Sequence, residues 1–150
     1  MRRENGTSCL DGQTTGMALS VLAEVGRLLE ALAATGETGA IDLRSLPLTD
    51  ADRAQLEDLL GHGEVHAELA VAGRSEVWET GYAGAWWIRH RGADERIATE
   101  VIAICPAPDI LKAHPDDIQA AARRIRRELE VAQAPAAADL SETPLETSHV

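Results

Sequence analysis

Acidic and histidine side chains recur along a stretch where apolar and polar residues alternate, and they are the groups best suited to chemistry. The members of this set are Glu64, His66, Glu68, Glu76, Glu79 and Glu100. Carboxylates that meet on a sheet can act as general acid and base, or they can bind a hard metal ion. A solvated strand face gives the same pattern without any chemistry. We favour the solvated face, and we expect no catalytic residue and no enzymatic activity.

A metal or cluster site is the second chemistry that the sequence suggests. Cys9 and Cys105 form no Cys-x-x-Cys pair, and Gly63 interrupts the helix that His62 and His66 would need to form a zinc site. The sequence also has no glycine-rich phosphate loop and no nucleophile elbow. We therefore expect no bound metal and no cofactor. A metal carrier that uses Cys105, His66 and the strand glutamates stays open as an alternative.

The composition is that of an acidic globular protein. The chain has 150 residues and a formal net charge of -11, which opposes binding to nucleic acid and to anionic membrane surfaces. No apolar run is long enough to span a bilayer, and no hydrophobic segment follows the arginines Arg2 and Arg3. We therefore expect a cytoplasmic protein that binds neither nucleic acid nor membrane.

Helical and strand periodicities follow one another along the chain. A helical apolar stripe begins at Met17 and ends at Thr35. A second helix runs from the N-cap Thr49, with Asp52 three residues on as in a capping box, to Gly61. Alternation then predicts four strands, at 64–71, 75–80, 85–91 and 96–104, which short turns connect. Pro115 opens a last helix. The predicted apolar stripe of this helix consists of Ile118, Ala122, Ile125 and Leu129. The short segment 40–43 is either an edge strand or a loop.

These elements predict an α+β fold in which an antiparallel four-stranded meander sheet packs with two to three helices. We expect a single domain over residues 17–132. Residues 1–16 and 133–150 are rich in small and polar side chains, and we expect a disordered N-terminal segment and a disordered acidic tail. A sheet with an uncovered face or edge also allows a homodimer.

The predicted strand at 85–91 carries the best candidate for contact with another protein. Alternation places Trp86 and Ile88 on one face, which we interpret as the core face, and Trp87, Arg89 and Arg91 on the other. An exposed tryptophan beside arginines has the composition of a binding hot spot. A Trp87 that is covered by a helix, or stacked on its arginines, is the alternative.

Glu100 differs from the other strand glutamates because it alternates with apolar residues, which predicts that its carboxylate is partly buried. Burial of a charged group is costly unless an opposite charge or a hydrogen-bond donor compensates for it. The candidates for that partner are Arg89, Arg91 and His90. We therefore expect Glu100 to form an ion pair inside the sheet region.

A series of short motifs resembles a known family. The motifs are Leu46-Pro47-Leu48-Thr49, Leu59-Leu60-Gly61-His62-Gly63-Glu64-Val65, Glu79-Thr80, Gly84-Ala85-Trp86-Trp87-Ile88, Glu100-Val101 and Pro115-Asp116-Asp117-Ile118. Over residues 43–130 they resemble the carboxy-terminal region of the hydrogenase expression/formation proteins, the HupH/HyaF family. One departure is the segment Ile102 to Cys105, which separates the Glu-Val pair from Pro106, whereas the family's proline follows more closely.

The resemblance implies a cytoplasmic, chaperone-like accessory protein for the maturation of an uptake nickel–iron hydrogenase. Its partner would be an immature hydrogenase subunit, with the iron–sulfur small subunit favoured, or another hydrogenase accessory protein. A metal or iron–sulfur carrier in the same pathway is the alternative. The expected partner-binding residues are Trp87, Arg89, Arg91, Glu64 and Glu79. The expected structural residues of the family motif are Gly61, Gly63, Gly84, Trp86 and Glu100.

Overall fold

The computed structural model describes residues 12–70 and 72–136. The chain divides into two compact units, Met1–Leu111 and Lys112–Val150. The range 17–132, which the sequence predicts as one domain, crosses the boundary between these units and stays a prediction. Most of the two segments predicted to be disordered, namely 1–11 and 137–150, lies outside the described residues.

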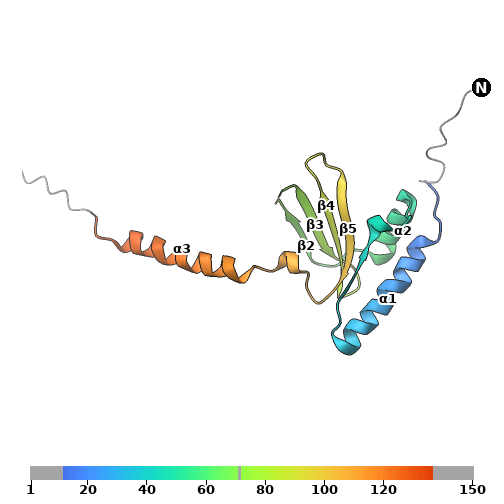
Figure 1. The fold of residues 1–150 in the computed structure, drawn as a ribbon, viewed down its shortest axis with the longest axis horizontal. Helices are drawn as coiled ribbons and strands as arrows, with labels where there is room; N and C mark the ends of the chain where they lie inside the picture. The colour runs from blue at the N-terminus through green and yellow to red at the C-terminus, as the bar shows by residue number, and fades with distance from the viewer. Residues whose placement is uncertain (1–11, 71, 137–150) are drawn as a thin grey trace, which may run out of the picture. The chain divides into compact units, whose positions relative to one another are not determined.

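The first unit contains two α-helices and an antiparallel sheet. The helices are α1 (Met17–Thr35) and α2 (Asp50–Leu60), and the short 3₁₀ turns are η1 (Leu43–Ser45) and η2 (Asp109–Leu111). The strands are β1 (Gly39–Asp42), β2 (His66–Leu69), β3 (Arg74–Glu79), β4 (Ala85–Arg91) and β5 (Ile97–Ile104). Their order in the sheet is β1-β5-β4-β3-β2, and α1 and α2 lie beside it (Figure 1).

The predicted α+β class and the antiparallel meander are confirmed, but the sheet has five strands instead of four. The additional strand is β1, which pairs with β5 from Gly39 opposite Ile104 to Asp42 opposite Val101. This is the segment that the sequence left open as edge strand or loop. Four residues are too few for an alternation of period two to be distinguished from a loop.

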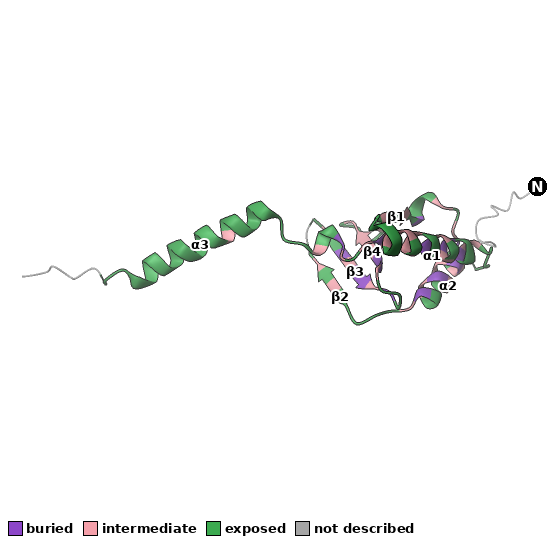
Figure 2. Ribbon diagram, turned by 90° about the horizontal axis from the view of Figure 1, so that it is seen from below, coloured by how far each residue is buried: buried purple, intermediate pink, exposed green. Residues whose placement is uncertain are grey.

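The core lies between the two helices and one face of the sheet. Ala18, Val21 and Val25 of α1 are buried together with Leu56 and Leu60 of α2. In Figure 2 the buried positions of α1 and α2 face the strands, and the outer surfaces of both helices are exposed. Aliphatic side chains and tryptophan fill this core, since the chain contains no phenylalanine.

The start of α2 carries the predicted capping box, in which Thr49 accepts a hydrogen bond from the backbone of Asp52 and Asp52 accepts one from the backbone of Thr49. Asp52 is fully buried and also accepts two 2.7 Å hydrogen bonds, from the backbone N–H and the hydroxyl of Thr15. The backbone bond from Thr15 is the largest of the effects that lower the pKa of Asp52 to about 2. Thr15, in a segment predicted to be disordered, is thus fixed on α2.

The second unit contains the helix α3 (Pro115–Gln133). His114 is its N-cap, Pro115 occupies the first turn, and Asp116 and Asp117 lie near the positive end of the helix dipole. The apolar residues of the predicted stripe, including Ile118, are exposed within the described part of the chain. None of the helices in the described ranges has both the length and the apolar character required to cross a membrane.

Candidate functional site

The sheet face beneath α1 and α2 has an apolar half and a charged half. In the apolar half, Trp78 of β3 is paired with Trp87 of β4. Two residues further along these strands, Glu76 is paired with Arg89, and Arg89 is paired with Glu100 of β5. Because side chains two residues apart point to the same side of a strand, these charges continue the core face beyond the tryptophans.

Trp87 is fully buried in the apolar half, so the prediction of an exposed Trp87 is wrong and the alternative of a covered tryptophan is correct. Trp86 is buried as well, with 5% of its surface exposed, and its indole N–H donates to the carbonyl of Cys105 on the opposite face. Alternation separated the two tryptophans onto opposite faces correctly. The alternation could not identify which face the helices cover, because both faces of β4 carry a tryptophan at the start of the strand.

An aromatic stack leads from the surface into the core. The imidazole of His62 lies parallel to the ring of Trp78, with 5.1 Å between centroids, and Trp78 stacks on Trp87 at 5.5 Å. The guanidinium of Arg89 lies 5.2 Å from the Trp78 ring and 5.8 Å from the Trp87 ring. Cation–π attraction and stacking therefore connect the charged half of the face to the apolar half.

Glu100 is fully buried and forms the ion pair that the sequence predicts. Its Oε2 accepts hydrogen bonds from Arg89 Nε at 2.7 Å and from the indole N–H of Trp87 at 3.3 Å, and its Oε1 lies 3.5 Å from Arg53 Nη1. Arg89 also donates to Glu57 of α2 at 3.3 Å. Burial acts to lower the pKa of Arg89, but the hydrogen bond to Glu100 and the nearby negative charges outweigh it and raise that pKa.

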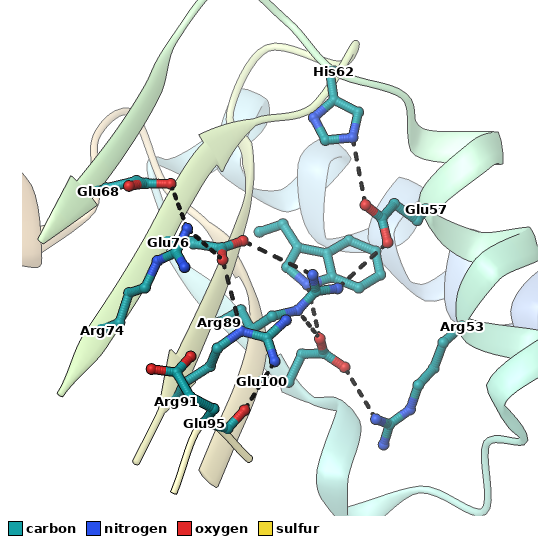
Figure 3. A network of polar contacts seen from close by, with 11 residues as sticks. Arg53, Glu57, His62, Glu68, Arg74, Glu76, Arg89, Arg91, Glu95 and Glu100 are labelled. Carbon is teal, nitrogen blue, oxygen red and sulfur yellow. Dashed lines mark hydrogen bonds and ion pairs between the residues drawn. The ribbon is translucent and has the colours of Figure 1, made fainter. Parts of the chain in front are cut away.

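More exposed charges surround this buried pair on β2, β3 and β4 (Figure 3). We call Glu68, Arg74, Glu76, Arg89 and Arg91 the charged half-face. Glu76 lies 3.7 Å from Arg91 and 3.9 Å from both Arg74 and Arg89, and Arg74 donates to Glu68 at 2.9 Å. The hydrogen bond from Arg74 lowers the pKa of Glu68. The half-face therefore presents Arg74 and Arg91 in partly solvated ion pairs, of which the pair of Arg74 with Glu68 is short and the pairs with Glu76 are long.

The structure brings together only some of the predicted partner-binding residues. Arg89 and Arg91 both reach Glu76 in the charged half-face. Glu79 is paired with Trp86 on the opposite sheet face, and Glu64 is exposed in the segment before β2. Neither acid joins the arginines, and a role in partner binding stays a prediction for all four charged residues.

The glycines of the family-like motif connect the end of α2 to the β3–β4 turn. Gly61 follows α2 with a φ of 66°, and Gly63 donates a 2.7 Å hydrogen bond to the carbonyl of Glu79. A Cβ atom on Gly63 would lie only 2.7 Å from the carbonyl oxygen of Thr80, so the backbones approach too closely for a side chain. Gly84, with a φ of 86°, permits the turn itself. His62 lies between Gly61 and Gly63, and its ring stacks on Trp78.

The contribution of α2 to the site was not predicted from the sequence. Arg53 and Glu57 reach the sheet face from α2, where they lie on the same side as the buried Leu56 and Leu60. Their spacing relative to the leucines was a usable signal, because residues three and four apart share one face of a helix. Trp78 was also missed as the centre of the aromatic stack.

The geometry does not assemble a site for metal chemistry in the ranges 12–70 and 72–136. No three histidine, cysteine or acidic side chains lie close enough there to hold a metal ion. The set proposed for a metal carrier, which included Cys105 and His66, is therefore not gathered at one place. The arrangement of partly solvated charges beside a rigid aromatic stack is instead suited to binding another protein.

Comparison with known proteins gives matches to hydrogenase expression proteins. Residues 16–132 match the family model described as "HupH hydrogenase expression protein, C-terminal conserved region". The solved structure of the hydrogenase expression protein HupH from Thiobacillus denitrificans is similar with a TM-score of 0.70 and 39% sequence identity, over 79% of this chain and 97% of that chain.

Two curated proteins are similar over a shorter region. The hydrogenase-1 operon protein HyaF of Escherichia coli is 31% identical over 57% of this chain and 30% of its own length. The hydrogenase expression/formation protein HoxQ of Azotobacter vinelandii is 26% identical over 58% of this chain and 31% of its own length. The chain thus matches about a third of the length of these relatives. With the family model matching most of the sequence, the chain belongs to the HupH hydrogenase expression protein family, through its C-terminal conserved region.

Proposed function

We propose that this chain is a non-enzymatic accessory protein in the maturation of a hydrogenase and that it binds an immature hydrogenase subunit. The observation that carries the proposal is the family match over residues 16–132. The relatives named for hydrogenase expression or formation support the same role, although the chain spans only part of their length. The finer proposal names the iron–sulfur small subunit as the partner and the cytoplasm as the place of binding.

The charged half-face is the surface that we assign to this partner. Arg91 lies 3.7 Å from Glu76, and Arg74 lies 3.9 Å from Glu76 and 2.9 Å from Glu68. Ion pairs that are exposed to solvent contribute little to stability, so exchange with a partner's carboxylates costs little. The buried pair of Arg89 and Glu100 holds the underlying strands in place. Because the strands are already held in place, less conformational entropy is lost when a partner binds. The exposed charges of Arg74 and Arg91 can attract an oppositely charged partner and can exchange their present ion pairs for new ones.

The test is a binding measurement with purified proteins. The full chain is titrated with the small-subunit precursor of its host's hydrogenase, and separately with the large-subunit precursor. Reversal of the outer charges, Arg74→Glu with Arg91→Glu, should weaken binding about tenfold or more and reduce its salt dependence. The matched control is Arg44→Glu, an exposed arginine of η1 outside the half-face. Equal affinity of the reversed variant and the control would refute the assignment of the surface.

A further inference from the structure

Helix α1 has a second apolar stripe beside the one that it buries in the core. Leu19, Leu22, Gly26 and Leu29 follow the three- and four-residue spacing of one helical face. Leu19 is 56% exposed, and Leu22 and Leu29 are half-buried. Burial of α1 against the sheet needs only one stripe, so the second one leaves apolar surface available to another molecule.

A pocket of about 240 Å³ lies on this second stripe. It is lined by Leu22, Val25, Gly26, Leu29 and Tyr82. Its volume is below the range of about 300–1,000 Å³ that is usual for small-molecule sites, and it fits one or two apolar side chains of a protein better. All five lining residues belong to the first unit.

Gly26 forms an open part of this pocket. It lies in the middle of α1, where glycine is less favourable for a helix than alanine. A Cβ at this position would have no atom within 4 Å, and its φ is not left-handed, so neither crowding nor backbone geometry requires a glycine. The missing side chain leaves space that an incoming side chain can fill.

Tyr82, from the β3–β4 turn, also lines the pocket and is 49% exposed. Its backbone is fixed, because its N–H donates to the Thr80 hydroxyl and its carbonyl accepts from the N–H of Ala85. The β3–β4 turn is packed closely on α1, since a Cβ on Gly84 would lie 3.3 Å from a methyl carbon of Leu29. An exposed tyrosine in a fixed position beside an apolar pocket has the composition of a binding hot spot.

We infer that this pocket, which we call the α1 pocket, receives an aliphatic or aromatic side chain of the hydrogenase subunit, next to a lysine or arginine of that subunit. The inference rests on the proposed function and adds a second contact to it. The charges beside the pocket favour a basic residue in the partner. Glu30 is exposed one turn beyond Gly26, the positive charge of Arg27 is compensated by its ion pair with Glu24, and the chain carries a net charge of -11. The apolar residue would supply affinity, and the basic residue would set its orientation.

The experiment compares two pocket variants with a control on the same helix. Gly26→Leu fills the α1 pocket, Tyr82→Ala removes one lining side chain, and Ala34→Leu adds an apolar side chain at an exposed position off the stripe. Affinity for the purified small- and large-subunit precursors is measured together with thermal melting and molar mass. We expect both pocket variants to bind at least tenfold more weakly, the control to bind within twofold of the wild type, and all three to fold.

Each other result decides a different point. Wild type that binds neither subunit would overturn the proposed function and this inference together. Wild type that binds, with pocket variants that bind equally well, would overturn only the inference. A wild-type dimer that Gly26→Leu converts into a monomer without loss of subunit binding would assign the α1 pocket to a second copy and overturn the hydrogenase subunit as its occupant. If Gly26→Leu fails to fold, the affinity of Tyr82→Ala alone tests the inference, with at least tenfold weaker binding expected and unchanged binding overturning it.

Discussion

Replacement of Trp87 by alanine tests the division of the sheet face into an apolar and a charged half. Trp87 is fully buried, and its side chain stacks on Trp78. A tryptophan removes about 150–250 Å² from water, which is worth about 4–6 kcal/mol at 25 cal/mol per Å². The alanine side chain still buries part of this area, whereas the cavity that the missing indole leaves adds to the loss of stability. We therefore expect Trp87→Ala to lower the free energy of unfolding by about 3–5 kcal/mol.

The assay is urea denaturation followed by far-ultraviolet circular dichroism, since the substitution itself changes tryptophan fluorescence. Thermal melting should show a decrease of more than about 10 °C in Tm. Tyr82→Ala is the control, because Tyr82 is an exposed aromatic residue and its loss should cost less than about 1 kcal/mol. If Trp87→Ala were destabilised by no more than this control, Trp87 would not be a core residue and the description of the site would be incorrect.

Three further predictions concern charges and backbone contacts. Glu100→Gln removes the 2.7 Å charged partner of Arg89 and should cost about 2–3 kcal/mol in urea titrations; an unchanged midpoint would contradict the role of the pair. Gly63→Ala should cost more than about 2 kcal/mol, because its Cβ would meet a backbone oxygen at 2.7 Å, and a neutral result in the same titration would show that the approach is not tight. The pKa of Asp52, about 2, lies below its value in the unfolded chain, so its stabilising effect is complete above about pH 4 and is lost as the pH falls toward 2. Asp52→Asn should flatten this acid-side loss in pH-dependent melting, and an identical pH profile would refute the assignment.

Local signals in the sequence predicted the parts of the fold that depend on neighbouring residues. The capping box at Thr49 and Asp52 was predicted because both residues lie within one helical turn. The meander followed from strands joined by short turns, whose pairing is local. Strand β1 was left open because its partner β5 is distant in sequence, and no local pattern reports such a pairing.

The site was predicted where it depends on adjacent strands and missed where it depends on tertiary packing. Arg89 was a predicted partner of Glu100, and the two are cross-strand neighbours. The contacts of Arg53 and Glu57 depend on how α2 lies over the sheet, which alternation within a strand does not encode. The same limitation explains why Trp87 was considered for the exposed face, since only the position of the helices distinguishes the two faces of β4.

The most direct test of the central claim is deletion of the gene in its host, followed by measurement of hydrogenase activity and of small-subunit processing under inducing conditions. We expect activity and mature small subunit to fall together, and the wild-type gene to restore both. A gene with Arg74→Glu and Arg91→Glu should restore them poorly, while the Arg44→Glu control should restore them fully. Normal hydrogenase activity and processing in the deletion strain would contradict a role for this chain in hydrogenase maturation.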